Sequence, residues 1–308
     1  MQKLYKFLLI LSPFLLILGG LEFAIYHTVY SFRHPPRPNS GIDPKTLLLS
    51  SNDITFTSEG ASLHGWLIIG KPGYPALIVA HNYGSNRSDA LGKLEGLITT
   101  LNKRGYSVFL FDFRGHGESS GITSLGYHES KDLEAAMKTV LKYKNIGRRI
   151  GILGIGMGAM AATEASVAAD EVKFVILDSI YGDIPSRCTD QVLQQWPMFS
   201  FARPVLLRVV DWNIKQVFDV PQSRVELLKQ MPKLYPRAVL FVEKDPLNDY
   251  SKKLYDATTE PKELIQLKET AEGELIGDRR ISYNDQVEQQ IEKYFPAQSN
   301  EATMTLKH

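Results

Sequence analysis

The chain has 308 residues, 44% of them hydrophobic, and a formal net charge of +1. This length suffices for one α/β domain of about 200 to 250 residues with attachments. A charge so close to zero creates no basic field, which excludes nucleic acid as an expected partner. The single cysteine, Cys188, excludes an internal disulfide framework and a thiolate metal cluster. We expect neither a metal ion nor a cofactor.

Residues 1–32 are predicted to form a membrane anchor. An apolar run extends to Leu21, is interrupted by Glu22 and continues to Phe32. From Phe7 to Tyr26 the run has the ~20 residues that a membrane-spanning helix needs. Because no small-x-small cleavage signal follows it, an uncleaved single-pass anchor is preferred over a signal peptide. Basic residues flank both ends of this segment, so the flanking charges do not predict on which side of the membrane the globular part lies.

A stiff, proline-rich linker over 33–52 leads into a main domain over 53–296, and a disordered polar tail is expected over 297–308. In the main domain, short apolar runs alternate with amphipathic segments, which predicts a doubly wound, mostly parallel α/β sheet that begins with a strand pair. The expected strands are 54–57, 63–69, 75–80, 106–111, 150–153, 172–177, 238–242 and 263–267, and the clearest helices are 89–103, 129–143 and 284–294. Sites in such sheets lie at the carboxyl ends of the strands.

Residues 180–237 interrupt this alternation. They are rich in large apolar side chains and are broken by Pro185, Pro197 and Pro204. A connection of this length in a compact domain is often functional. We therefore predict a helical insertion that covers the carboxyl edge as a lid, with plain packing as the alternative.

The stretch Gly151 to Met160 reads as a strand, a sharp turn and a helix. Small residues flank its central position, as they do in a nucleophile elbow, because the turn is too tight for side chains beside the nucleophile. The residue at the central position is Gly156, which carries no side chain.

Four motifs together carry a family resemblance: the pair Asn86-Arg87, the string from Asp112 to Ser119, the small-x-x-x-small elbow, and the segment from Glu243 to Pro246. From about Asp53 to Phe295 the chain resembles the α/β-hydrolase superfamily, and most of all its membrane-anchored serine hydrolases. The resemblance implies an α/β-hydrolase fold and a serine, acid and histidine triad in that chain order.

The resemblance also implies that the triad is incomplete. Asp245 matches the acid position, Gly156 stands at the nucleophile position, and Glu272 stands where the histidine base is expected. Between His128 and His308 the sequence contains no histidine at all. Two of the three catalytic groups are therefore missing.

The oxyanion hole depends on backbone rather than side chains. In the family it is formed by the N–H group after the nucleophile, here Met157, and by one from the loop after the third strand, here near Asn82 or Tyr83. We expect these donors to remain able to hold a carboxylate or carbonyl oxygen. The family's usual His-Gly in that loop is replaced by His81-Asn82.

Other residues near the active edge offer alternatives. A substitute nucleophile would come from Ser85, Ser119, Ser179 or Cys188. His81 and His116 are structural members of loop motifs in the family. Asp178 is either an alternative acid or a capping residue of its turn. Glu272 beside Asp245 would place two acids in one pocket and raise a pKa.

The leading hypothesis is a membrane-anchored pseudohydrolase that binds an apolar or acyl-type ligand, or a protein partner, beneath its lid. One alternative is an active ester or amide hydrolase that uses Cys188 or Ser179 as its nucleophile. Another is a membrane scaffold whose lid surface docks a second protein.

Overall fold

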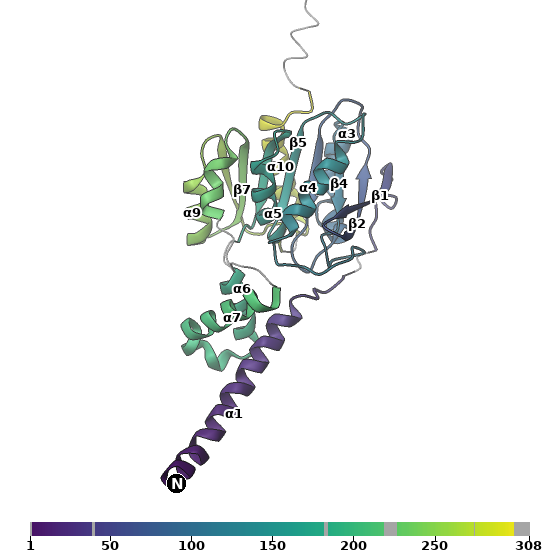
Figure 1. The fold of residues 1–308 in the computed structure, drawn as a ribbon. Helices are drawn as coiled ribbons and strands as arrows, with labels where there is room; N and C mark the ends of the chain where they lie inside the picture. Colours follow the sequence, from purple (N-terminus) through teal and green to yellow (C-terminus); the bar gives the residue numbers. More distant parts are fainter. Residues whose placement is uncertain (1, 39–40, 182–183, 219–226, 274, 299–308) are drawn as a thin grey trace, which may run out of the picture. The chain divides into compact units, whose positions relative to one another are not determined.

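The computed structural model describes residues 2–38, 41–181, 184–218, 227–273 and 275–298 (Figure 1). The chain forms two compact units. The helical unit combines Met1–His34 with Asp183–Val225, and the sheet unit combines Pro35–Gly182 with Glu226–His308. The part of the predicted tail from 299 onward lies outside the described residues.

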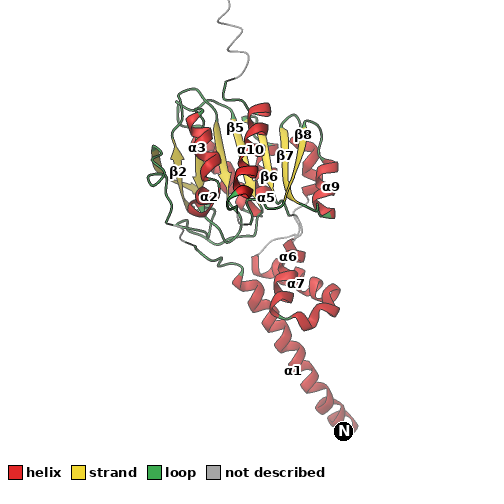
Figure 2. Cartoon of the chain, turned by 180° about the vertical axis from the view of Figure 1, so that it is seen from behind, coloured by secondary structure: helices red, strands yellow, loops and turns green. Residues whose placement is uncertain are grey.

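The sheet unit contains an eight-stranded sheet with the order β1-β2-β4-β3-β5-β6-β7-β8 (Figure 2). β2 is antiparallel to both β1 and β4, and all other neighbours are parallel. This confirms the predicted mostly parallel, doubly wound sheet and its opening strand pair. The strands are β1 (Ser51–Ser58), β2 (Ala61–Ile68), β3 (Ala76–Ala80), β4 (Ser107–Phe111), β5 (Ile150–Ile155), β6 (Val172–Asp178), β7 (Ala238–Lys244) and β8 (Lys262–Leu267).

Helices cover both faces of this sheet, which is why the central strands are almost entirely apolar. Every residue of β3, β4 and β5 is buried. On one face, α2 and α3 share a core cluster with α10, and on the other face α4 packs on α5 while Tyr255 of α9 contacts Phe241 of β7. These helices are α2 (Arg87–Lys93), α3 (Glu95–Lys103), α4 (Glu129–Val140), α5 (Met157–Val167), α9 (Asp249–Ala257) and α10 (Asp278–Tyr294), and the short α8 (Leu227–Gln230) leads into the 3-10 helix η2 (Met231–Leu234).

Three predicted helices differ from the structure, the first being the helix expected over 129–143, which ends as α4 at Val140. The single helix expected over 89–103 is two helices, because Leu94 leaves helical geometry at φ −103°, ψ 15°. The last helix begins at Asp278 rather than near Asn284. Its first turns are mostly exposed and so carry no apolar period, while the acidic Asp278 in the first turn complements the helix dipole.

The predicted linker contacts the sheet unit. Arg37 donates a hydrogen bond to the carbonyl oxygen of Gly117 at 3.0 Å, and the Ser88 hydroxyl donates to the carbonyl oxygen of Ile42 at 2.5 Å. The described part of this proline-rich segment is therefore held against the loops that follow β3 and β4.

The helical unit contains α1 (Gln2–Ser31), α6 (Ile184–Gln195), the 3-10 helix η1 (Pro197–Ala202) and α7 (Arg203–Phe218). α1 packs along α7, with Ile25 and Val29 buried, and Asn213 of α7 donates a hydrogen bond to Glu22 Oε1 at 3.0 Å. The stretch Leu11–Ser31 of α1 is long and apolar enough to cross a membrane. The inserted segment is helical in this part, and its predicted role as a lid over the carboxyl edge stays a prediction.

Candidate active site

The elbow lies between β5 and α5. Gly156 adopts φ 54° and ψ −108°, a left-handed conformation that glycine reaches without the steric cost of a Cβ atom. A Cβ atom at Gly158 would be closer than 3.0 Å to the backbone of Ala80 in β3. The small residues on either side of the central position are thus required by the close approach of helix and strand.

The side chain of Asn82 occupies the centre of this site. Its Oδ1 accepts hydrogen bonds from the N–H groups of Tyr83 at 2.8 Å and Met157 at 3.0 Å. The hydroxyl group of Tyr181 donates to the same oxygen at 3.1 Å. Two backbone N–H groups and a hydroxyl thus converge on one carbonyl oxygen, as the donors of an oxyanion hole do on a substrate oxygen. The oxygen that accepts here belongs to the chain itself.

The same carboxamide fills the space beside Gly156. A Cβ atom built on Gly156 would be closer than 3.0 Å to the Oδ1, Cγ and Nδ2 atoms of Asn82. A side chain at position 156 and the Asn82 carboxamide therefore compete for one volume, and adding one at 156 would require the Asn82 side chain to move. The sequence shows the two changes separately, an asparagine where glycine is usual and a glycine where serine is usual. The structure shows that they fit one another.

Glu272 lies on the other side of the Asn82 carboxamide. Asn82 Nδ2 donates a hydrogen bond to Glu272 Oε1 at 3.3 Å, so both polar ends of the amide are engaged. A carboxylate that accepts from the amide nitrogen polarises the group and strengthens the bonds that the amide oxygen accepts. The structure thus brings together Gly156, Met157, Asn82, Tyr83 and Glu272 from the sequence-predicted set.

Asp245, at the acid position, is exposed in the loop after β7, where its own N–H donates to the carbonyl oxygen of Leu267 at 2.8 Å. The buried acid nearby is Glu243, the penultimate residue of β7, which the sequence indicated only as part of a motif. Its Oε1 accepts from the N–H of Ile180 at 3.2 Å. Burial, with further contributions from Asp178 and Glu272, raises the pKa of Glu243 to about 8.

Asp178 ends β6 inside a hydrogen-bond network. One carboxylate oxygen accepts from the N–H of Ala271 at 3.0 Å and the other from the hydroxyl of Ser179 at 2.8 Å. Burial raises the pKa of Asp178 to about 6. Ser179, at φ 51°, also shares a hydrogen bond of 2.6 Å with the Thr270 hydroxyl. This cluster holds the β6 loop against the loop that carries Glu272.

Both histidines near the edge are buried. His81 donates from Nδ1 to the carbonyl oxygen of Asn82 at 2.7 Å and accepts at Nε2 from the N–H of Phe113 at 3.0 Å. His116 donates from Nδ1 to the carbonyl oxygen of Arg114 at 2.9 Å. Burial lowers the pKa of each histidine to about 4. These neutral rings support the loops after β3 and β4 by hydrogen bonding.

The remaining candidate nucleophiles are engaged or buried. Ser119 donates to the carbonyl oxygen of Asp112 at 2.6 Å, and Ser85 donates to Asp89 at 2.5 Å. Cys188 is buried in α6 of the helical unit. Among the described residues, no group of three or more His, Cys, Asp or Glu side chains is placed to hold a metal ion.

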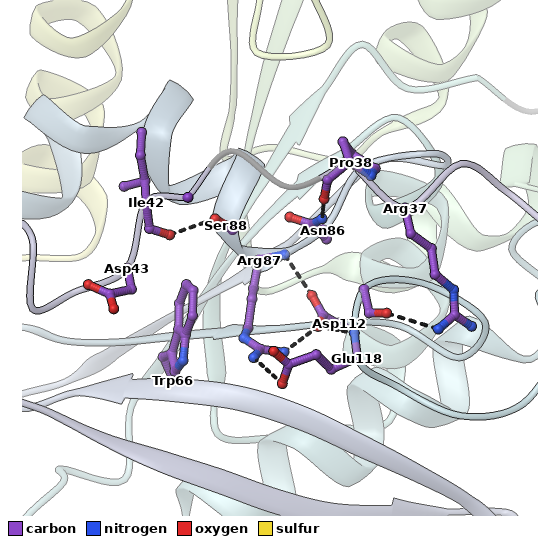
Figure 3. Close-up of a pocket in the computed structure, with 12 residues that line it drawn as sticks. Arg37, Pro38, Ile42, Asp43, Trp66, Asn86, Arg87, Ser88, Asp112 and Glu118 are labelled. Carbon is purple, nitrogen blue, oxygen red and sulfur yellow. Dashed lines mark hydrogen bonds and ion pairs between the residues drawn. The ribbon is translucent and has the colours of Figure 1, made fainter.

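A separate hollow of about 350 Å³ lies beside Arg87 in the sheet unit (Figure 3). Arg87 forms ion pairs with Asp112 and with Glu118, the latter at 2.7 Å, and its guanidinium lies 4.5 Å from the ring centroid of Trp66. The positive charge at the centre of the hollow is therefore already compensated. This network fixes the ends of the loops after β3 and β4 rather than offering a charge to a ligand.

Comparison with known proteins places these loops in context. The family model described as alpha/beta hydrolase fold matches residues 75–299. The chain is 29% identical over 198 residues to the uncharacterized protein YqkD of Bacillus subtilis (strain 168), an alignment that covers 61% of this chain and 61% of that relative. It is 27% identical over 130 residues to the thiohydrolase aneE of Aspergillus aculeatus, covering 41% of this chain and 40% of the relative. The chain spans about three fifths of the length of the first curated relatives that it matches.

Among solved structures, the chain is similar to the Pyrococcus furiosus esterase Pf2001, with a TM-score of 0.68 and 21% identity over 85% of this chain and 97% of that one. It is also similar to an alpha-beta hydrolase from Vibrio vulnificus, with a TM-score of 0.62 and 19% identity over 89% and 93% of the two chains. Identities this low show the shared fold and do not transfer an activity.

Proposed function

Because the chain belongs to the α/β-hydrolase fold family, and because its own Asn82 fills the oxyanion hole, we propose that it is a non-hydrolytic member of that family. The single observation that carries the proposal is the convergence of the Tyr83 and Met157 N–H groups on Asn82 Oδ1. A substrate carbonyl would have to displace this oxygen before it could be polarised. Gly156 would then still offer no atom to attack it.

We assign the protein a binding role at the membrane. Its ligand is an apolar or acyl-type molecule, or its partner is a protein, and α1 anchors it to the bilayer. The stretch Leu11–Ser31 supports the anchor by its length and apolar character. The sheet and the elbow keep the fold of the family although residue 156 is a glycine, and this supports a role in binding without hydrolysis.

The test is covalent labelling of the full-length chain in detergent or vesicles with a fluorophosphonate probe, together with turnover of short-chain and long-chain esters. We expect neither labelling nor turnover. Gly156→Ser is the matched variant, and we expect it to remain unlabelled because no histidine base faces the new hydroxyl. Stoichiometric labelling of the unmodified chain, or burst kinetics in Gly156→Ser, would overturn the proposal.

One observation favours a second candidate, an active hydrolase that uses Ser179. This serine sits at φ 51° at the carboxyl end of β6, and its hydroxyl contacts the buried Asp178. Strained backbone at a strand end is a feature of catalytic residues. If the candidate is right, Ser179→Ala abolishes a measurable ester or amide hydrolysis, whereas Cys188→Ala leaves it intact. If the unmodified chain shows no such activity, this candidate fails.

A further inference from the structure

The inserted helices of the helical unit expose two different surfaces. On α6, the exposed positions include Arg187, Asp190 and Gln194, which are polar or charged. On η1 and α7, large apolar side chains are exposed instead. Their exposed fractions are 72% for Met198, 86% for Phe201, 65% for Val205 and 56% for Trp212. Positions 201, 205, 208 and 212 follow the three-to-four residue spacing of one helix face.

α7 lies along α1 and therefore shares its surroundings. The Ile25 and Val29 side chains are buried, and Asn213, itself fully buried, donates to Glu22. At 1.5 Å per residue the 21-residue stretch Leu11–Ser31 is about 31 Å long, close to the ~30 Å hydrocarbon thickness of a bilayer. Glu22 stands next to the middle of that stretch. A helix that contacts α1 there lies at or within the membrane if α1 does.

The Glu22–Asn213 contact has the chemistry expected of a lipid-facing helix pair. A carboxyl group inside a membrane helix is costly unless a neighbouring helix supplies a polar partner. Asn213 supplies an amide donor and is 0% exposed, while Glu22 is half-buried, so the polar contact lies largely between the two helices. Outward, the pair exposes Leu16, Ile17 and Phe23 of α1 together with Phe201 and Trp212.

We propose that the face formed by Met198, Phe201, Val205 and Trp212, the η1–α7 face, is a second membrane-contacting surface that enters the lipid leaflet beside the C-terminal half of α1. The inference rests on the proposed membrane anchor. Its occupant is lipid because α7 packs along α1, whose own exposed side chains are largely apolar. Arg208, exposed on the same face, can extend its long stem toward headgroups.

The test places an environment-sensitive probe on this face in the full-length chain. In a Cys188→Ala background, Phe201→Cys carries an NBD fluorophore and Gln194→Cys on α6 is the matched control. The labelled chains are incorporated into vesicles of phosphatidylcholine and phosphatidylglycerol, with or without lipids that carry a nitroxide on the acyl chain. We expect a blue-shifted emission at position 201 that is quenched at least twofold more by the nitroxide lipid than the emission at position 194.

A second measurement avoids the cysteine background. In a Trp66→Phe/Trp196→Phe chain, Trp212 is the only tryptophan, and we expect brominated lipids to quench it. Chains that float with vesicles but show equal, weak quenching at 201 and 194 overturn this inference and leave the anchor standing. A blue shift at 201 without lipid quenching also overturns it, because protein would then cover the face. Failure of the chains to float with vesicles would overturn both the anchor and the η1–α7 face. The absence of hydrolysis is tested separately, by fluorophosphonate labelling.

Discussion

The loops after β4 and after β5 lie at the same edge of the sheet but differ in their side chains. After β4, Asp112 is buried and Glu118 is exposed, and both pair with the buried Arg87 at the start of α2; Arg114 donates from Nε to both oxygens of Asp132 at 3.1 and 3.0 Å. After β5, the catalytic position is a glycine, and the chain's own amide lies over it. The network after β4 is intact although the turn after β5 lacks a nucleophilic side chain, so we expect the network to stabilise the fold whether or not the chain hydrolyses a substrate.

The largest expected effect breaks the network after β4. Asp112→Ala removes a carboxylate that is 1% exposed and leaves the Arg87 guanidinium buried without its main partner. Loss of one partner of a buried pair costs about 3–5 kcal/mol of unfolding free energy. Glu118→Gln is the control, because Glu118 is 70% exposed and an exposed pair contributes less than about 1 kcal/mol. Chemical denaturation measures both, and equal losses would contradict the distinction.

A second change restores a side chain at the elbow. Gly156→Ser imposes a positive φ on a serine and overlaps the Asn82 carboxamide, which together should cost about 2–4 kcal/mol. Adding Asn82→Gly removes the overlap. The double variant should therefore lose at least about 1 kcal/mol less unfolding free energy than the sum of the losses of the two single variants. Additive losses in this double-mutant cycle would show that the two positions do not compete.

The buried acid Glu243 predicts a pH dependence. Its pKa is about 8 in the folded chain, whereas an unperturbed glutamate titrates near 4.5. The folded chain therefore holds a proton that the unfolded chain releases, so this contribution to stability is present at low pH and is lost as pH rises through about 8. His81 and His116, whose pKa values are lowered to about 4, lose their contribution as pH falls below about 6.5. Between pH 6.5 and 8.5, Glu243 therefore dominates the change of unfolding free energy with pH.

Glu243→Gln, which stays neutral, should flatten that slope. Between pH 6.5 and pH 8.5, we expect the unfolding free energy of this variant to rise by on the order of 1–2 kcal/mol relative to that of the unmodified chain. Thermal unfolding over this range measures the gain, and Glu263→Gln, a change at a surface acid that pairs with Lys293, is the control. Parallel pH profiles of the Glu243→Gln variant and the unmodified chain would contradict a raised pKa.

The smallest expected effect concerns the amide that fills the oxyanion hole. Glu272→Gln weakens the acceptor for Asn82 Nδ2 and should cost about 0.5–1 kcal/mol, the range of one half-buried hydrogen bond. Glu269→Gln in the same loop, where Glu269 pairs with Lys244 at 3.2 Å, separates this loss from a general loss of loop charge. A loss confined to Glu269→Gln would show that Glu272 does not hold the amide.

The sheet was predictable because its strands are continuous apolar runs bounded by turn residues. The elbow was predictable because only small residues permit a strand and helix to approach so closely. The role of the Asn82 side chain was not, because it depends on a contact between residues 82 and 156 that no local pattern encodes. The signal existed as a reciprocal change in size, a side chain gained at Asn82 and lost at Gly156. Glu243 was missed because the apolar run predicts a strand that ends at Val242, whereas β7 continues through Glu243 and buries its side chain.

The contact between α1 and α7 has a practical consequence for producing this protein. Deleting residues 1–34 to obtain a soluble fragment would remove Ile25, Val29 and Glu22, which cover α7 and engage the fully buried Asn213. The inserted helices would then lose their packing contacts with α1 and expose apolar surface that promotes aggregation. A fragment designed for crystallisation should therefore keep both segments or delete both, with a short glycine-rich connection in place of residues 183–225.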